Sequence, residues 1–231
     1  MANEAPALLV RDLAKSFPSP SGGRVRVLDV PALDFEDGQT LGVEGTSGSG
    51  KTTLLNVIAG VLPADEGRVE IAGRPMTGLG EAARDRLRAE RIGYLFQTFL
   101  LLPHLSAEEN VVLGMRFKPA GDKAPRVAAL EALDRVGLRQ RRHHRPKQLS
   151  VGQQQRVAIA RALAGTPSLV LADEPTASLD RENADTCLDL LLEFAGERNA
   201  AVLVVSHDDD ALARFEHRVR LDPPIESEDA A

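Results

Sequence analysis

The chain has 231 residues, a formal net charge of −6 and a single cysteine. This length suits one α/β domain, and the acidic balance argues against a protein that coats nucleic acid, so no nucleic-acid partner is expected. Cys187 cannot form an internal disulfide, which fits a reducing compartment, and its apolar-periodic surroundings favour a buried, inert thiol. Because no run approaches the ~20 apolar residues that span a bilayer, and no secretion signal begins the chain, we expect a soluble, cytoplasmic protein.

The first hundred residues alternate between expected strands and two expected helices. Strands are predicted at 7–10, 25–28 and 40–43, with a Pro/Ser/Gly loop at 18–23. A helix should begin at Lys51 and end near Gly60. A fourth strand (66–73), a charged surface helix (81–91) and a fifth strand (92–96) follow.

Helical signals dominate from Ser106 to Gly165, with Pro119 and Pro125 marking a loop around Gly121. Two strongly apolar strands come next, at 168–172 and 201–205, with an amphipathic helix from about 181 to 197 between them. Continuous apolar strands that alternate with helices indicate a parallel sheet covered on both faces. We therefore expect one α/β domain over 1–231, with a helical subdomain inserted at about 98–165 and a frayed acidic tail at about 222–231.

A glycine-rich loop, GTSGSGKT, occupies residues 45–52 and fits G-x-x-x-x-G-K-[ST] at every fixed position. It stands after an expected strand and before an expected helix, as the motif requires. Backbone N–H groups of such a loop converge on phosphate oxygens, Lys51 adds a positive charge, and Thr52 would place its hydroxyl on Mg²⁺. The alternative, a Gly/Ser turn that caps a helix, is disfavoured by the complete spacing.

An acid pair, Asp173–Glu174, closes a buried apolar strand. Asp173 is placed to hold Mg²⁺ through its water shell, and Glu174 to face an attacking water. The pair alone could equally be a polar turn, but the phosphate loop makes the catalytic reading the better one. His207 closes another apolar strand at the same sheet edge, where an imidazole can donate a hydrogen bond to a γ-phosphate, although a lone histidine is more often structural.

The segment LSVGQQQRVAIARAL at 149–163 closely resembles the LSGGQ signature of ATP-binding cassette (ABC) proteins. DEPTASLD at 173–180 resembles the acid motif and D-loop of that family, Gln97 its Q-loop glutamine, and His207 its switch histidine. Phe17 matches the aromatic that stacks on adenine, with an ordinary core aromatic as the alternative. The resemblance implies a P-loop NTPase (RecA-like) core, an N-terminal antiparallel β subdomain and an inserted α-helical signature subdomain.

An ATPase that uses ATP and Mg²⁺ is implied by this resemblance. The implied catalytic residues are Glu174, His207 and Lys51, and the implied metal-binding residues are Thr52, Gln97 and Asp173. The implied nucleotide-binding residues are Phe17, Gly45, Thr46, Ser47, Gly48, Ser49, Gly50, Lys51, Thr52, Thr53, Gln97, Ser150, Gly152, Gln153 and Asp180.

A second anion site is indicated by Ser150 and Gly152, which precede an apolar helix. Since the chain already has a phosphate loop, this second site makes sense if it serves the nucleotide of a partner chain. In the family, ATP is sandwiched between Lys51 of one subunit and Ser150 of the other, in a homodimer or a pair with a paralogous ATPase subunit, and Asp180 bridges the two sites. Val151 departs from the family's usual glycine, so we expect altered packing there with ATPase activity retained.

The stretch RIGYLFQTFLLLPHLSAEENV at 91–111 is similar to the ATP-binding subunits of lipoprotein-release, macrolide-export and cell-division transporters. That branch pairs with a separate transmembrane permease and transmits force, which implies a peripheral position on the inner face of the cell membrane. Phe96, Phe99, Leu100 and Leu102 are candidate permease contacts, with lobe core as the alternative for each. A basic segment at 139–145 is better read as a solvated face than as a lipid contact.

Two other functions stay open from the sequence. One is a soluble ABC-type ATPase that acts on a non-membrane partner such as DNA or ribosomes, although such proteins usually carry two cassettes or a coiled-coil insertion. The other is a scaffold that binds ATP without turnover, against which Glu174 and His207 weigh. Few residues follow His207, so no regulatory domain of the importer type is expected, and the resemblance implies that the permease sets the transported substrate.

Overall fold

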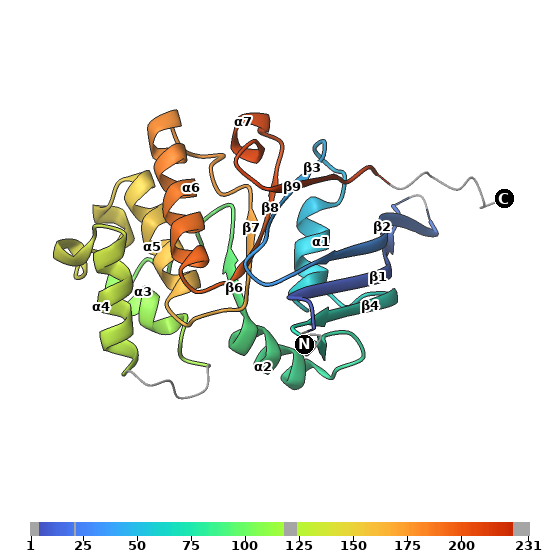
Figure 1. Cartoon of the computed structure of the whole chain (residues 1–231), viewed down its shortest axis with the longest axis horizontal. Coiled ribbons are helices and arrows are strands. Elements are labelled where there is room, and N and C mark those ends of the chain that lie inside the picture. The colour runs from blue at the N-terminus through green and yellow to red at the C-terminus, as the bar shows by residue number, and fades with distance from the viewer. Residues whose placement is uncertain (1–4, 21, 118–123, 224–231) are drawn as a thin grey trace.

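The computed structural model describes residues 5–20, 22–117 and 124–223. It places a parallel sheet in the centre, a group of helices on one side of it, and an antiparallel sheet on the other (Figure 1). Over those described ranges, no helix is both long and apolar enough to cross a bilayer. The α/β fold with two kinds of sheet is the one that the sequence predicts.

The parallel sheet has the strand order β6-β7-β8-β3-β9. Its strands are β3 (Thr40–Glu44), β6 (Ile92–Leu95), β7 (Leu169–Asp173), β8 (Ala201–Ser206) and β9 (His217–Arg220). The register aligns Glu44 with Ser206 and Asp173 with Val205, so the carboxyl ends of β3, β7 and β8 meet at one edge. Ligands of open parallel sheets bind at this kind of edge.

The antiparallel sheet has the order β2-β1-β4-β5. Its strands are β1 (Leu8–Pro18), β2 (Arg24–Phe35), β4 (Glu66–Ile71) and β5 (Arg74–Pro75). β1 and β2 are much longer than the expected 7–10 and 25–28. Asp12 adopts a left-handed φ of 50°, and the β1–β2 register shifts between Lys15 and Ser16, so the alternation of apolar and polar residues that marks a strand is interrupted.

Most helices lie where the sequence predicts them. The helices are α1 (Lys51–Ile58), α2 (Glu81–Arg91), α3 (Ala107–Leu113), α4 (Pro125–Arg135), α5 (Val151–Leu163), α6 (Arg181–Gly196) and α7 (Asp209–Leu212), with short 3-10 turns η1 (Arg139–Arg141) and η2 (Pro146–Gln148). Ser106 caps α3 and Ser150 caps α5, each in a capping box that satisfies free N–H groups at the helix start. The expected loop around Gly121, with Pro119, and the tail from 224 onward lie outside the described residues.

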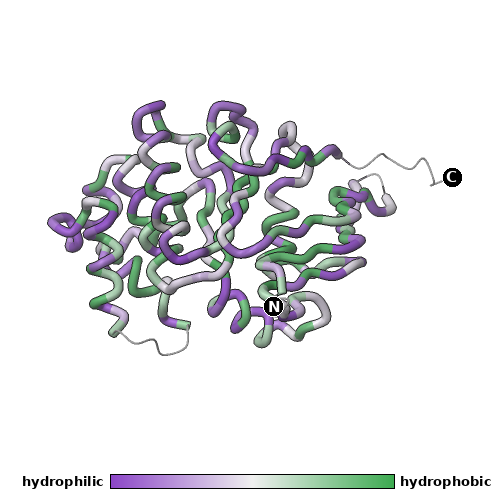
Figure 2. Tube along the Cα trace, in the orientation of Figure 1, coloured by the Kyte–Doolittle hydropathy of each residue, from purple (hydrophilic) through white to green (hydrophobic). Residues whose placement is uncertain are grey.

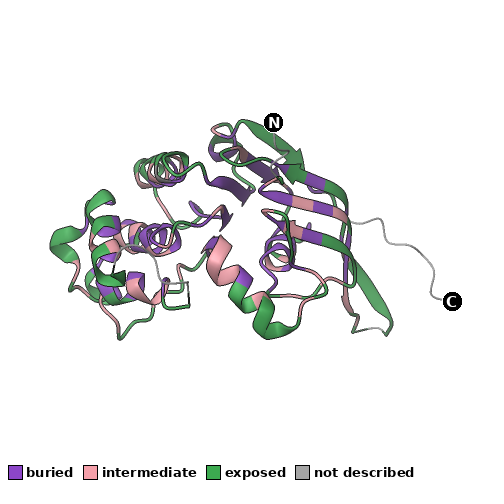
Figure 3. Ribbon diagram, turned by 60° about the horizontal axis from the view of Figure 1, so that its bottom comes forward, coloured by how far each residue is buried: buried purple, intermediate pink, exposed green. Residues whose placement is uncertain are grey.

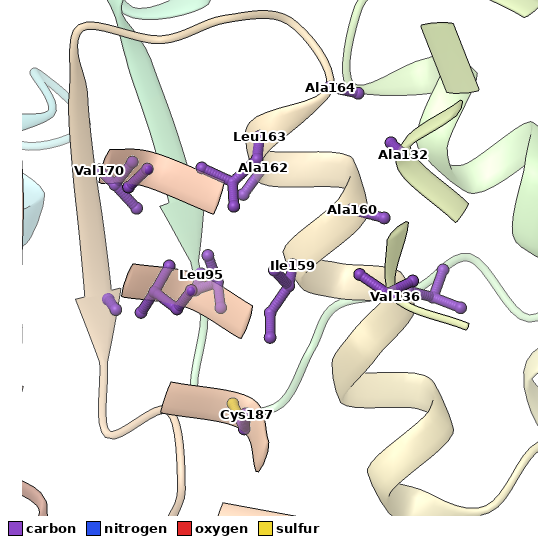
Figure 4. Packing of buried hydrophobic residues seen from close by; sticks show 14 of the residues in the cluster. Leu95, Ala132, Val136, Ile159, Ala160, Ala162, Leu163, Ala164, Val170 and Cys187 are labelled. Carbon is purple, nitrogen blue, oxygen red and sulfur yellow. The ribbon is translucent and has the colours of Figure 1, made fainter. Parts of the chain in front are cut away.

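Two hydrophobic cores form on opposite faces of the parallel sheet because alternate residues of each strand point in opposite directions. Val170 and Val202 pack with helices α3 to α6, and Cys187 is buried there as expected. Leu171 and Leu203 pack with α1 and the antiparallel sheet. The central strands are hydrophobic (Figure 2) and buried (Figure 3). Figure 4 shows side chains of β6, β7 and α5 meeting in the first core.

The helices between β6 and β7 form the lobe that the sequence places in the middle of the chain. Most of their buried hydrophobic residues belong to the first of the two cores described above. That 1–231 is one domain, with an insertion at about 98–165, stays a prediction.

Candidate functional site

The glycine-rich loop turns between β3 and α1 with two glycines in left-handed conformations. Gly48 has φ 82° and Gly50, the residue before α1, has φ 93°. A Cβ on Gly50 would lie 2.6 Å from the carbonyl oxygen of Val27, so strand β2 approaches the loop closely at this point. A Cβ on Gly48 would meet nothing within 4 Å, which leaves its side of the loop open. Glycine is therefore required by conformation at Gly48 and by both conformation and space at Gly50.

Lys51 is buried at the base of this loop. Its Nζ donates hydrogen bonds to the carbonyl oxygens of Gly45 (2.6 Å) and Thr46 (3.0 Å) and lies 3.8 Å from Glu174 Oε1. Ser49 Oγ is buried and has no hydrogen-bond partner among the described residues. A buried cation next to an unpaired hydroxyl fits an anionic ligand, because an unsatisfied buried polar group is costly.

Asp173 lies at the end of β7, opposite the start of α1. Thr52 Oγ1 donates to Asp173 Oδ1 at 3.2 Å. Burial raises the pKa of Asp173, the hydrogen bond from Thr52 opposes that rise, the charge of Glu174 adds to it, and Lys51 lowers it. A hydroxyl and a carboxylate at hydrogen-bond distance form the oxygen donor set that suits Mg²⁺.

Glu174, directly after β7, contacts residues at the end of the neighbouring strand β8. It has a left-handed φ of 45°, and such strained conformations of non-glycine residues cluster at functional sites. Glu174 Oε1 lies 2.9 Å from Nδ1 of His207, and Glu174 Oε2 accepts a hydrogen bond from Ser206 Oγ at 3.1 Å. The structure therefore brings Lys51, Glu174 and His207 together within one chain.

Ser206 and Tyr94 are neighbours of the site that the sequence did not indicate. Ser206 lies directly before His207, and that position was the only available signal. The Tyr94 hydroxyl donates to Asn56 Oδ1 on α1 at 3.2 Å. Burial, and to a lesser degree the charge of Asp173, raise the pKa of Tyr94.

Gln97 lies two residues beyond β6, whose Leu95 pairs with Ala172 next to Asp173. It is exposed, and it stands at the same sheet edge as the acid pair. The segment before it is fixed by the ring of Phe96, which stacks on Tyr94 with centroids 4.1 Å apart. Gln97 is therefore near the candidate site by position.

Phe17 is half-buried on β1, opposite Val25 of β2. Lys15 Nζ lies 5.7 Å from the centroid of its ring, and Lys15 is itself held by Asp65 at 2.9 Å. Since Val27, two residues beyond Val25, touches the phosphate loop, the register places Phe17 on the sheet that borders this loop.

The signature residues lie apart from the phosphate loop. Helix α5 is on the opposite side of the parallel sheet from α1 (Figure 1). Ser150 Oγ accepts from the backbone N–H of Gln153 (3.3 Å), and Gln153 Oε1 accepts from the N–H of Ser150 (3.1 Å). Ser150 and Gln153 thus cap α5.

Gly152 packs against the D-loop region. A Cβ on Gly152 would lie 2.6 Å from Oδ1 of Asn183, whose side-chain amide donates to both carboxylate oxygens of Asp180 at 2.8 and 3.0 Å. Asp180 also caps α6, and these hydrogen bonds lower its pKa. The start of the signature helix and the cap of α6 therefore form one packed unit.

Comparisons with known proteins agree with this geometry. A protein-family model described as "ABC transporter" matches residues 28–177. The chain is 43% identical over 201 residues to the lipoprotein-releasing system ATP-binding protein LolD of Hydrogenovibrio crunogenus, covering 86% of this chain and 87% of that protein. It is 42% identical over 189 residues to an uncharacterized ABC transporter ATP-binding protein, YbbA, of Escherichia coli K12, covering 82% and 83%.

Solved structures extend the likeness to the whole fold. A structure described as the dimeric post-hydrolysis state of the ATP-binding cassette MJ0796 bound to ADP and Pi superimposes with a TM-score of 0.85 at 36% identity, covering 93% of this chain and 94% of that one. Together with the phosphate loop and the acid pair at one sheet edge, these matches show that the chain belongs to the ABC transporter family, as an ATP-binding subunit with ATPase activity.

Proposed function

We propose that this ATPase subunit drives a separate transmembrane permease by closing and opening a head-to-tail dimer with ATP at its interface. The observation that carries the proposal is the separation of the two anion-binding elements. Lys51, Glu174 and His207 are joined within the chain, whereas Ser150 caps a helix on the other side of the parallel sheet. A second copy, or a paralogous subunit, would bring its own Ser150 to the phosphate loop.

In the proposed reaction, Lys51 and the loop amides hold the phosphates of ATP, and Phe17 stacks on the adenine. Glu174 polarises the attacking water, and His207, held at 2.9 Å from Glu174, faces the γ-phosphate. Thr52, Asp173 and Gln97 would hold Mg²⁺, which would neutralise developing phosphate charge. Gly45, Thr46, Ser47, Ser49 and Thr53 complete the phosphate loop and the first turn of α1.

The dimer is supported by the similar solved cassette, which is described as dimeric. In the proposed dimer, Ser150, Gly152 and Gln153 face the partner's nucleotide, and Asp180 lies across the interface from the other site. ATP binding closes the dimer, and hydrolysis releases it. The capping bonds of Ser150 support this role because they hold its hydroxyl at an exposed helix start.

The permease contact is best placed on the segment after Gln97. Leu100 is 54% exposed and Leu102 is 38% exposed, whereas Phe96 is half-buried in a stack with Tyr94. A groove of about 1720 Å³ is lined by Leu105, three residues after Leu102 in the chain, and by residues of α3 and α4. We propose that a cytoplasmic helix of the permease docks on Leu100 and Leu102 and extends into this groove.

The branch is proposed from the relatives. One is named a lipoprotein-releasing system ATP-binding protein, so a permease of an export or force-transmitting type fits best. The subunit would then be cytoplasmic and peripheral on the inner face of the cell membrane. The transported substrate would be set by the permease.

Co-purification from native membranes tests the proposal. We expect a tagged wild-type chain, purified after mild detergent solubilisation, to bring one membrane permease that mass spectrometry identifies. A variant with Leu100→Glu and Leu102→Glu should lose the permease, because buried carboxylates without partners destabilise an apolar contact.

Val219→Glu is the matched control. Val219 is 42% exposed on the edge strand β9, away from the helical lobe, and the control should keep the permease. Recovery of the wild-type chain only from the soluble fraction, with a non-membrane partner, would contradict the proposal and favour the soluble ATPase.

A further inference from the structure

The turn after Gln97 has an unusual backbone. Phe99 and Leu100 both adopt left-handed conformations, with φ values of 58° and 45°. Phe99 N–H donates to the carbonyl oxygen of Phe96 at 3.0 Å, and Leu100 N–H donates to that of Thr98 at 2.6 Å. Two consecutive non-glycine residues in this region are strained, so contacts from the surrounding structure must hold them in place.

Arg161 supplies such contacts from helix α5. Its Nη1 donates to the carbonyl oxygen of Leu100 and its Nη2 donates to that of Phe99, both at 2.6 Å. The stem of Arg161 runs past Gly114, where a Cβ would lie 2.7 Å from Arg161 Cγ. A planar guanidinium that binds two neighbouring carbonyls fixes the orientation of both peptide groups.

The same helix reaches the acid motif. Gln155, which is fully buried, donates from Nε2 to the carbonyl oxygen of Pro175 at 2.6 Å, and Pro175 directly follows Glu174. Helix α5 therefore begins at the Ser150 cap and makes two further contacts. Gln155 donates a hydrogen bond to the acid segment, and Arg161 donates two hydrogen bonds to the turn after Gln97. A movement of that turn would be transmitted along one helix.

We propose that Arg161 is a positioning residue that fastens the strained Phe99–Leu100 turn to the signature helix α5 and thereby keeps Gln97 at the nucleotide site. This rests on the proposed function through the role of Gln97 at the metal. The same contact would transmit a force applied by the permease at Leu100 to helix α5. The side chain of Leu100 is exposed, while its carbonyl oxygen accepts a hydrogen bond from Arg161.

Arg161→Lys and Arg161→Ala of the full chain test this proposal. Lysine keeps the charge and most of the stem, but its single ammonium group cannot reproduce the planar fork on two carbonyls. Arg156→Lys is the matched control, because Arg156 lies on the same helix and donates to the carbonyl oxygen of Val136 within the lobe, at 3.3 Å.

Hydrogen exchange measured by mass spectrometry reports the turn itself. We expect the peptide that spans 97–102 to exchange about tenfold faster in Arg161→Lys, with peptides of the two sheets unchanged, since local opening affects only the segment released. The control should match the wild type. Unchanged exchange in this peptide in both Arg161 variants would overturn the proposal.

ATP turnover reports the consequence for the site. In Arg161→Lys we expect kcat to fall about fivefold and the half-saturating Mg²⁺ concentration to rise, with KM for ATP within about twofold of wild type, because the phosphate loop is untouched. If Arg161 only stabilised the turn, its loss would leave the Mg²⁺ requirement unchanged. Faster hydrogen exchange together with an unchanged kcat and Mg²⁺ requirement would therefore overturn the proposal.

Gln97→Ala tests the underlying function separately. If this variant keeps the wild-type Mg²⁺ requirement, the proposed role of Gln97 at the metal fails. The exchange experiment would still show whether Arg161 fastens the turn, so the two failures can be told apart.

Discussion

The acid end and the signature end of this cassette are built in opposite ways. At the acid end, side chains from the start of α1 and from the ends of β7 and β8 meet within one chain: Lys51 lies 3.8 Å from Glu174, and His207 lies 2.9 Å from it. At the signature end, Ser150 and Gln153 are hydrogen-bonded to each other at an exposed helix start. The acid end gathers its charged side chains from one chain, whereas the signature end lies on the other side of the parallel sheet from the phosphate loop.

The two ends are connected within the chain by packing and hydrogen bonds. Gly152 packs on Asn183, Asn183 holds Asp180, and Gln155 bonds to the carbonyl oxygen next to Glu174. If each end serves a different nucleotide, these bonds connect the two nucleotides of a dimer through the interior of each chain. Variants of one end can therefore be compared directly with variants of the other.

Glu174→Gln should have the largest effect. We expect ATP turnover to fall at least about 100-fold, because a general base is removed, while the ATP-dependent dimer persists. Phosphate release and light scattering after size exclusion measure the two properties. Glu193→Gln, an exposed glutamate of α6, is the control and should keep full turnover; turnover retained by Glu174→Gln would contradict the role of this residue.

Ser150→Asp separates the cap of α5 from its proposed ligand. Aspartate caps a helix as well as serine, so the fold should be kept, but its charge would repel the partner's phosphates; we expect turnover to fall at least about tenfold with an unchanged melting temperature. Ser106→Asp, in the corresponding capping box of α3, should change neither property. Equal losses in both variants would mean that the cap alone matters.

Cys187 lies where Gln155 of the signature helix meets the acid segment. Its Sγ lies 3.6 Å from Gln155 Nε2 and 3.8 Å from the carbonyl oxygen of Pro175. Burial raises its pKa from 9.0 to about 11, against a smaller opposing effect of the Gln155 hydrogen bond. The folded state thus binds the thiol proton more tightly than the unfolded state does. The resulting contribution to the free energy of unfolding is fully present below about pH 9 and is lost as the pH rises toward 11.

Urea unfolding of the wild type and of Cys187→Ala tests this sign. Between about pH 8 and about pH 10 the free energy of unfolding of the wild type should fall by about 1 kcal/mol more than that of the variant. Equal pH dependence in the two proteins would show that the thiol is not buried as described.

Val151→Gly should have the smallest effect. Val151 is 47% exposed in the first turn of α5, so little packing is lost, and glycine costs at most about 1 kcal/mol of helix stability. We expect the ATPase rate to stay within about an order of magnitude of wild type, since the cap at Ser150 and the packing of Gly152 remain. Complete loss of turnover would contradict the proposed role of the signature helix.

Motifs with fixed local spacing were predictable from the sequence. The phosphate loop, the acid pair and His207 each follow an apolar run, and the rule that parallel strands end at one edge was enough to bring them together. Helix α2 was predicted at its observed bounds because a charged helix between a loop and a strand leaves a clear local pattern.

Features that depend on distant or exposed residues were not predictable. Strand β9 is exposed along its length and has no apolar pattern, and α7 is a single short turn. The grip of Arg161 on the turn at Phe99 joins residues 62 positions apart. The hydroxyl of Ser206 reaches Glu174 only because β7 and β8 are neighbours in the sheet.

A mixing experiment tests most directly whether the two ends of one chain serve different nucleotides. Lys51→Ala should inactivate both sites of a homodimer, and so should Ser150→Asp. In a mixed dimer both changes fall on one site and leave the other intact, so mixing the two inactive proteins in equal amounts should restore about a quarter of the wild-type ATPase rate when the chains reassort at random. No recovery, in a mixture shown to form mixed dimers, would contradict a site shared between two chains.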